Sequence, residues 1–247
     1  MSYSDSDSRP ATLTELLDRR AARQPNDLAY AFVADGDVVK DRLTYAELDS
    51  QARHIAGLLR TAGTGHEPVL LLYPPGLDYI AAFFGCIYAG AIAVPAYPPH
   101  RNRSLDRLRG IVADAGARVV LCSESVRSSL KRAFEDAPEF RDLVWLATDG
   151  GEALAAEAGA PEPASPDTLA FLQYTSGSTS APKGVMLSHG NLMHNLAAID
   201  SGFDCGPGTI GAFWLPLYHD MGLIGGVLEP LYCGGPSYLM APATFLS

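Results

Sequence analysis

Short apolar runs alternate with helix-like segments through the middle of this chain, and this alternation limits the fold more than any other feature. The apolar runs predict strands, and the segments between them have helical periodicity. The predicted strands are Val69–Tyr73, Ala91–Ala96, Val119–Cys122 and Leu143–Ala147, and the predicted helices are Leu77–Ala89, Ser104–Ala115 and Glu124–Glu135. Elements of this length in this order indicate βαβ units. We therefore expect an α/β fold class, with mainly parallel sheets flanked by helices.

Further elements are predicted on both sides of this block. Before it come an amphipathic helix, a hairpin around the turn-rich sequence ADGD, and a helix that Thr44 and Glu47 open as a capping box. After it come two short strands joined by a loop, a helix capped by Ser188, and a helix broken at Gly225–Gly226 between two last strands. In chain order these elements are Leu13–Gln24, Leu28–Val33, Val39–Leu43, Thr44 to about Ala62, Thr168–Tyr174, Gly184–Leu187, Ala212–Leu217, Asp220–Leu231 and Tyr238–Met240.

Residues 11–247 are expected to form one incomplete domain after a polar, disordered tail at residues 1–10. Within this domain, residues 66–204 would form a βαβ subdomain that carries the loop described below. Residues 11–65 and 205–247 would belong to a second, truncated subdomain. The last residues are apolar, so we expect that more chain packs against this end.

The composition narrows the classes of partner. The chain has 247 residues, of which 47% are hydrophobic, and a formal net charge of −10. An acidic chain repels nucleic acid and anionic membranes, so neither is an expected partner. Four cysteines are widely spaced without a CxxC pair, which is typical of reduced thiols in a cytoplasmic protein. The first residues lack the cationic and apolar regions of a signal peptide.

One segment raises the question of a membrane span. Tyr79–Tyr97 is uncharged over 19 residues, which reaches the length of a spanning helix. Gly85, Gly90 and Pro95 interrupt it, and Gly90 stands where a helix would end. The segment then divides into a helix followed by a buried strand, so no membrane span is expected.

The loop between the strands that end at Tyr174 and begin at Gly184 is the strongest functional signal. Its sequence from Tyr174 to Asn191 reads YTSGSTSAPKGVMLSHGN. A surface loop or linker is the ordinary interpretation of such composition, but apolar elements hold both ends of this one. Glycine backbone, several hydroxyls and the cation of Lys183 suit an anion such as a polyphosphate. The Walker pattern does not fit, because Pro182 precedes Lys183 and Gly184 follows it.

The pair His219-Asp220 in LPLYHDMGL is the other polar feature in apolar surroundings. His219 is either a structural histidine or a group at the mouth of an apolar pocket, because Trp214, Tyr218, Met221 and Leu223 surround it in the sequence. The HExxH, GxSxG and GxGxxG patterns are absent, and no metal-ligand set is predicted.

The loop sequence resembles the phosphate loop of the adenylate-forming superfamily, in the order [ST]SG[ST]T-x-x-PKG. More narrowly, LTYAELD, AVPAYPP, FLQYTSGSTSAPKGVMLSHGNL and WLPLYHDMGLIGGVLEPLY together resemble fatty acyl-AMP ligases. The resemblance runs from about Thr12 to the last residue and covers the first part of the large N-terminal domain.

This resemblance implies a reaction and a set of site residues. The reaction is activation of a fatty acid by ATP and Mg²⁺ to an acyl-adenylate, with release of pyrophosphate and transfer of the acyl group to an acyl carrier protein in polyketide or lipopeptide assembly. Lys183 and His219 would be catalytic. The ATP phosphates would lie against Thr175, Ser176, Gly177, Ser178, Thr179, Lys183 and Gly184. The substrate pocket would include Trp214, Tyr218, His219, Met221 and Gly222.

Several parts of such enzymes are missing from this sequence, including the adenine and Mg²⁺ motif, the ribose-binding Asp and the small C-terminal domain. The missing C-terminal part of the same enzyme is therefore an expected partner, and the isolated chain is expected to be inactive. Two alternatives stay open: a coenzyme A-dependent acyl synthetase, which shares the loop, and a non-catalytic module that binds nucleotide or acyl groups.

Overall fold

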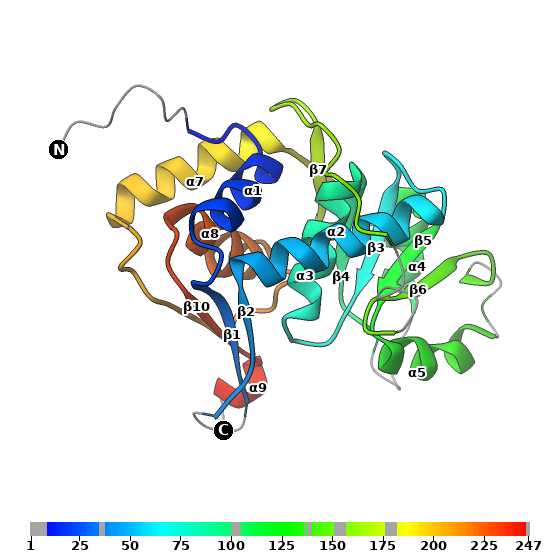
Figure 1. Cartoon of the computed structure of the whole chain (residues 1–247). Coiled ribbons are helices and arrows are strands. Elements are labelled where there is room, and N and C mark those ends of the chain that lie inside the picture. The colour runs from blue at the N-terminus through cyan, green and yellow to red at the C-terminus, as the bar shows by residue number, and fades with distance from the viewer. Residues whose placement is uncertain are drawn as a thin grey trace.

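The computed structural model describes residues 9–34, 38–99, 105–135, 137, 140–150, 157–175 and 182–245. Within these ranges the strands form one sheet of six strands and one of four. Figure 1 shows the two sheets in different parts of the molecule, with helices α2 (Tyr45–Thr61) and α3 (Asp78–Ala89) between them. One continuous core cluster contains side chains of both helices and of both sheets.

The six-stranded sheet has the order β6-β5-β3-β4-β7-β8. All neighbours in it are parallel except β7 and β8, which are antiparallel. The prediction of an α/β fold with a mainly parallel sheet is therefore confirmed. The strands are β3 (Pro68–Leu72), β4 (Ile92–Ala96), β5 (Val119–Cys122), β6 (Val144–Ala147), β7 (Leu169–Thr175) and β8 (Lys183–Ser188).

Helices cover both faces of this sheet, as the alternation of the sequence predicts. Val69 and Leu71 of β3 belong to the core that includes α2 and α3. Leu70 and Leu72 belong to a second core with α4 (Asp106–Ala115) and α5 (Glu124–Glu135). Successive side chains of a strand point to opposite faces, so an uninterrupted apolar run fits a strand buried on both sides. The predicted start of α4 at Ser104 lies outside the described residues.

Helix α3 explains the long uncharged segment. It has 12 residues, and all of them after Asp78 are buried. Gly90 then adopts the left-handed conformation with φ +75° and ends the helix, as predicted. At Gly85 an added Cβ would lie 2.4 Å from Cγ2 of Ile55, so glycine permits the close approach of α2. In the described part of the chain, no helix combines the length and hydropathy that a membrane span needs.

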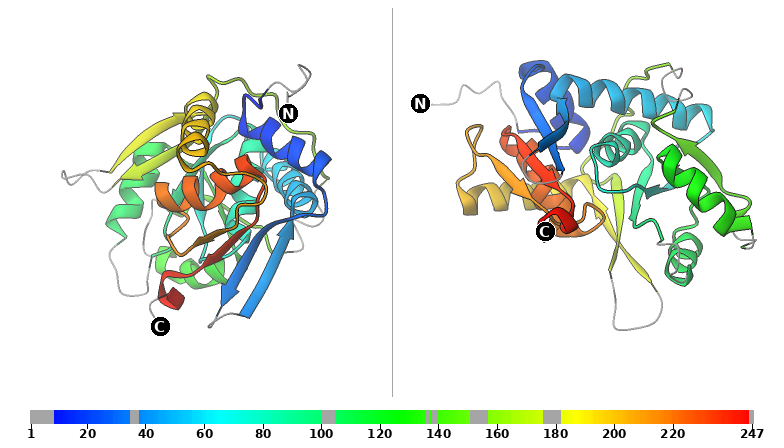
Figure 2. Two further views of the ribbon diagram at one scale, coloured as in Figure 1. Left: turned by 90° about the vertical axis from the view of Figure 1, so that its left-hand side faces the viewer. Right: turned by 90° about the horizontal axis from the view of Figure 1, so that it is seen from below.

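The four-stranded sheet has the order β2-β1-β10-β9 and joins segments from the two ends of the chain. β1 pairs antiparallel with β2, as the hairpin prediction requires, and parallel with β10. Figure 2 shows β1 and β10 side by side with α1 nearby. The assignment of these segments to a separate subdomain stays a prediction. The elements are α1 (Leu13–Arg23), β1 (Leu28–Ala34), β2 (Val38–Thr44), β9 (Gly211–Phe213), β10 (Ser237–Met240) and α9 (Pro242–Phe245).

Two predicted elements near the end of the chain differ from the structure. β9 stops at Phe213, well before the predicted end at Leu217. The helix predicted to break at Gly225–Gly226 continues through both glycines as a π-helix, η2 (Met221–Leu228), and then as α8 (Glu229–Cys233). The glycines serve packing, because a Cβ added at Gly226 would lie 3.3 Å from the ring of Phe213. The expected break was therefore wrong.

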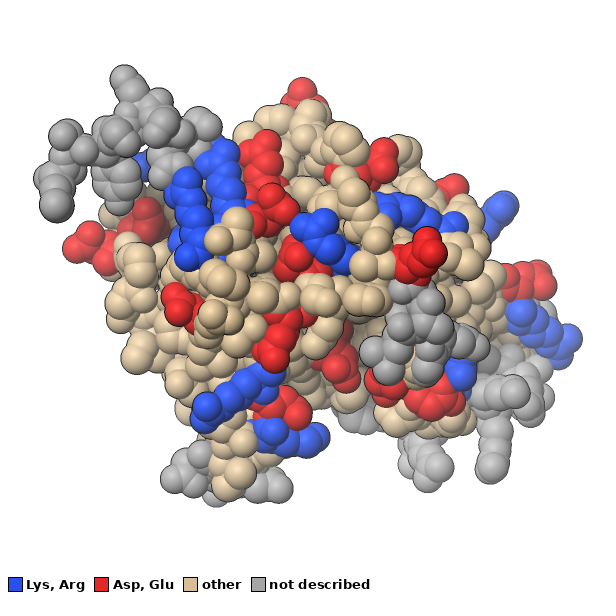
Figure 3. Space-filling view, viewed as in Figure 1, with Lys and Arg blue, Asp and Glu red and all other residues tan. Residues whose placement is uncertain are grey.

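Charged side chains of both signs share the surface. Figure 3 shows Lys and Arg among Asp and Glu on the face seen in Figure 1. Arg53 illustrates this mixing, since it forms ion pairs with Asp18 at 2.9 Å and with Asp49 at 2.7 Å.

Candidate functional site

The antiparallel pair β7 and β8 carries the two ends of the predicted phosphate loop. Its register places Thr175 opposite Lys183, and both residues are exposed. Directly opposed residues of an antiparallel pair project from the same face, so a hydroxyl and a cation lie together. Both strands are side by side in Figure 2. The predicted residues Ser176, Gly177, Ser178 and Thr179 lie outside the described residues.

Tyr174 fastens the end of β7 to α4. Its hydroxyl donates a hydrogen bond to Oδ2 of Asp114 at 2.6 Å, and its carbonyl accepts one from Arg107 at 3.4 Å. Burial and the neighbouring carboxylate raise the pKa of Tyr174 above its ordinary value, so the hydroxyl remains a donor. At Gly184, an added Cβ would lie 2.9 Å from Cζ of Tyr174, so only glycine leaves room for this ring.

Pro182 fastens the other end of the loop to the same helix. A Cβ added at Gly110 of α4 would lie 2.7 Å from Cγ of Pro182. Proline offers no N–H to a phosphate, but here it packs against the helix. Sequence reasoning missed Gly110 and Asp114, because neither a glycine nor an acidic residue within a predicted helix signals a contact with a distant loop.

The far end of β8 is fixed by a capping box and a buried histidine. Ser188 caps α7 (His189–Phe203), and its side chain and that of Asn191 exchange hydrogen bonds with each other's backbone N–H groups. Nδ1 of His189 accepts a hydrogen bond from the N–H of Leu13 at 3.1 Å. Burial lowers the pKa of His189 to about 4, so the ring is neutral near pH 7. The predicted cap at Ser188 is confirmed, and β8 is held at both ends.

The segment that contains His219 is attached to β7 beside the loop. Gln173, a buried residue of β7, donates a hydrogen bond to the carbonyl of Tyr218 at 3.0 Å. The ring of Tyr218 contacts the ring of Tyr97, with centroids 5.0 Å apart. His219 and Asp220 are both exposed, and their side chains lie 2.6 Å apart. The structure thus attaches the segment that contains His219 to the strand that carries Thr175, and the role of His219 stays a prediction.

The other predicted pocket residues have different surroundings. Trp214 stacks on Phe245 of α9, with centroids 4.0 Å apart. The side chain of Met221 is 64% exposed. Gly222 is buried, and a Cβ there would lie 2.1 Å from the carbonyl oxygen of Pro216. Their common role as a substrate pocket stays a prediction.

Comparison with known proteins decides the family. The model of the AMP-binding enzyme family matches residues 17–247. The chain belongs to the AMP-binding enzyme family. Similar proteins also confirm the predicted resemblance of this AMP-binding chain to the N-terminal part of fatty acyl-AMP ligases.

Three of these relatives show how much of the enzyme the AMP-binding chain covers. The medium-chain-fatty-acid–[acyl-carrier-protein] ligase JamA of Moorena producens is 42% identical over 95% of this chain and 40% of its own length. The crystal structure of the fatty acid AMP ligase from Legionella pneumophila has a TM-score of 0.86 and 37% identity, covering 99% of this chain and 42% of that one. The fatty acyl-adenylate ligase of L. pneumophila in complex with acyl adenylate and pyrophosphate has a TM-score of 0.85 and 36% identity, with the same coverage. The chain therefore spans about two fifths of the length of these relatives.

Proposed function

We propose that this chain is the first part of the large domain of an enzyme that activates a fatty acid with ATP and passes the acyl group to an acyl carrier protein. The observation that carries this proposal is the register that sets Thr175 opposite Lys183 at the two ends of the loop. A hydroxyl donor and an ammonium group on one face suit the oxygens of a polyphosphate. The name of the relative JamA supports the fatty acid and the carrier protein as substrates.

The proposed reaction joins the carboxylate of the fatty acid to the α-phosphate of ATP. A carboxylate oxygen attacks the α-phosphorus, the bond to the bridging oxygen breaks, and pyrophosphate leaves with the negative charge. Protein groups that hold this charge lower the barrier. Mg²⁺ would add positive charge at the phosphates, and it would be held mainly through them and by residues outside this chain. The phosphates would be held by Thr175, Ser176, Gly177, Ser178, Thr179, Lys183 and Gly184.

The acyl side of the proposed site lies along the segment that follows β9. Gln173 fastens this segment to β7 near Thr175, so the acyl passage and the phosphates would be neighbours. His219 would stand beside the adenylate, because its exposed ring is open to a ligand there. The acyl chain would pass Trp214, Tyr218, Met221 and Gly222.

The test of the phosphate site needs a polypeptide that carries this chain together with the further length that its relatives have. In it, Lys183→Ala is compared with Lys40→Ala, a control on the exposed strand β2. Loss of one charge-assisted contact to pyrophosphate costs about 1.5–3 kcal/mol, or roughly ten- to a hundredfold in rate. We expect that loss in acyl-adenylate formation and a much smaller one in transfer from preformed acyl-adenylate.

The same assay separates the proposed site from a structural loop and tests the acyl acceptor. Equal losses in both half-reactions, or a large fall in melting temperature for Lys183→Ala, would show that Lys183 supports the fold instead of the phosphates. Offering either an acyl carrier protein or coenzyme A to the preformed acyl-adenylate identifies the acceptor. Transfer to coenzyme A in preference to the carrier would contradict the proposed acceptor.

A further inference from the structure

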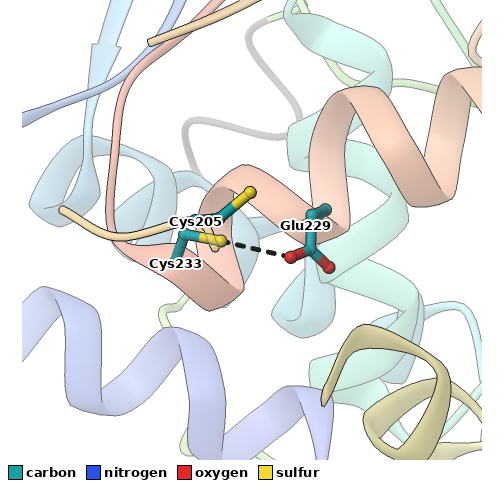
Figure 4. A group of neighbouring side chains, drawn as sticks. All are labelled: Cys205, Glu229 and Cys233. Carbon is teal, nitrogen blue, oxygen red and sulfur yellow. Dashed lines mark hydrogen bonds between the residues drawn. The ribbon is translucent and has the colours of Figure 1, made fainter. Parts of the chain in front are cut away.

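Two cysteines and one glutamate from distant parts of the sequence meet in a cluster outside the proposed ATP site. Glu229 and Cys233 are the first and last residues of α8, one helical turn apart and therefore on one face. Cys205 follows the end of α7. The two sulfur atoms and a carboxylate oxygen lie within 4.8 Å of one another. Figure 4 shows the three side chains together.

The cluster contains a buried carboxylate oxygen without a hydrogen-bond partner in the described part of the chain. Sγ of Cys233 donates a hydrogen bond to Oε1 of Glu229 at 3.2 Å. Oε2 of the same glutamate, whose residue is only 6% exposed, has no hydrogen-bond partner among the residues that the structure describes. A buried carboxylate oxygen without a partner is costly, and such an atom in a native structure calls for a bound ion or other explanation. The cluster therefore has an unused ligand atom.

A fourth ligand atom lies close by. Oδ1 of Asp200, in the last turn of α7, is 3.8 Å from Sγ of Cys233. The carbonyl of the same aspartate accepts a hydrogen bond from the N–H of Cys205 at 3.4 Å, which keeps the two residues together. Two thiols and the carboxylate of Glu229 thus converge, and the carboxylate of Asp200 lies beside one of these thiols.

The acidic groups of this cluster are close enough to influence one another. Burial and the nearby carboxylate of Asp200 raise the pKa of Glu229. Burial, Glu229 and Cys205 all raise the pKa of the Cys233 thiol. The nearby Arg20 directs its guanidinium to the carbonyls of Leu231 and Tyr232. Ionised ligands here would repel one another, and a cation among them would remove that repulsion.

We propose that Cys205, Glu229 and Cys233 bind a thiophilic divalent cation of the Zn²⁺ class, with Asp200 as the fourth ligand. Sulfur ligands select such a cation over Mg²⁺ or Ca²⁺, which prefer oxygen. At Zn–S distances of about 2.3 Å, two sulfur ligands of a tetrahedral ion lie about 3.8 Å apart. The two sulfur atoms therefore need to close by no more than about 1 Å from their 4.8 Å limit.

Binding the cation exchanges protons for metal. The thiols of Cys205 and Cys233 each lose a proton to solvent, and the hydrogen bond from Cys233 to Glu229 is replaced by bonds to the metal. Affinity therefore rises with pH. The ion would link the end of α7 to the end of α8, which continues directly from η2.

The test uses the 247-residue chain, kept reduced and stripped of metal, and titrates it with Zn²⁺ and with Co²⁺. We expect one equivalent of each to bind, and Co²⁺ to produce both the charge-transfer absorption of thiolate ligands and the visible bands of a tetrahedral ion. Cys205→Ser, Cys233→Ser and Glu229→Gln should each weaken binding at least tenfold. Cys86→Ala, a buried free cysteine in α3, should bind like the unaltered chain.

Measurements on the same samples distinguish a loss of metal binding from a loss of folding. Circular dichroism reports whether each variant is folded, and half-buried Cys205 is the substitution least expected to disturb the core. Zn²⁺ should raise the melting temperature of the unaltered chain and leave that of Cys205→Ser unchanged. Absence of thiolate bands with Co²⁺ would overturn the site. So would thiolate bands in Cys205→Ser and Cys233→Ser as strong as those of the unaltered chain. So would a Cys205–Cys233 disulfide whose reduction restores no metal binding.

Discussion

Substituting one glycine in each of two helices should change the stability of this protein in opposite directions. Gly85 lies inside α3, where an added Cβ would be 2.4 Å from Cγ2 and 2.6 Å from Cβ of Ile55. Gly202 lies near the end of α7, where an added Cβ would meet nothing within 4 Å. Both substitutions to alanine gain up to about 1 kcal/mol of helix propensity. The contacts that each added methyl group makes therefore decide whether the substitution stabilises or destabilises the protein.

The contact at Gly85 is costly because Ile55 cannot avoid it by a rotamer change alone. Its own Cβ is among the clashing atoms, so α2 and α3 must separate by about 1 Å to restore ordinary contact distances. Overpacking of a close-packed core costs about 1–3 kcal/mol, and contacts as short as these place Gly85→Ala in the upper part of that range. After subtraction of the gain in helix propensity, the net loss should be about 1–2 kcal/mol. Gly202→Ala should stabilise by about 0.5 kcal/mol, since it lies in the fraying last turn.

Urea unfolding followed by circular dichroism measures both changes as shifts of the midpoint at constant slope. Ile55→Ala removes one of the two clashing carbon contacts, so it should cost less in the Gly85→Ala background than in the unaltered chain. A Gly85→Ala protein as stable as the unaltered chain, or two midpoints that move in the same direction, would refute the close packing of α2 against α3.

Two more predictions concern the anchors of β7 and β8. Tyr174→Phe removes the hydrogen bond to the exposed carboxylate of Asp114, so it should cost about 1 kcal/mol and speed amide hydrogen exchange in β8. Tyr79→Phe removes a buried hydroxyl that has no partner among the described residues, so it should be neutral or stabilising. Equal effects of the two would contradict the anchoring role. Because the folded pKa of His189, about 4, lies below an unfolded value of about 6.5, its contribution is complete above pH 6.5 and is lost as the pH falls toward 4. Between pH 7 and pH 5 the unaltered chain should therefore lose about 2 kcal/mol more free energy of unfolding than His189→Asn, a variant that keeps an acceptor for the N–H of Leu13. Urea unfolding at several pH values measures this difference. The same pH dependence in both proteins would exclude a buried neutral histidine.

Local signals carried the parts of this fold that were predicted correctly. The capping box at Thr44, the helix cap at Ser188 and the left-handed Gly90 are set by a few neighbouring residues, and the alternating strands and helices follow from periodicity. The pairing of β1 with β10 and the contact between Tyr174 and Asp114 join distant segments, and no local pattern encodes them. The predicted break in η2 was wrong because tertiary packing against Phe213 overrides the low helix propensity of glycine.

The pairing of β1 with β10 has a consequence for how the protein is made. The hydroxyl of Tyr30 in β1 reaches the carbonyl of Val227, 197 residues further along the chain, and the partner strand β10 begins only at Ser237. During synthesis the hairpin of β1 and β2 emerges first, and the unpaired edge of β1 must wait until β10 has been translated. An open strand edge is a template for unwanted association, so this edge is the place where a ribosome-bound or heat-shocked chain most needs a chaperone.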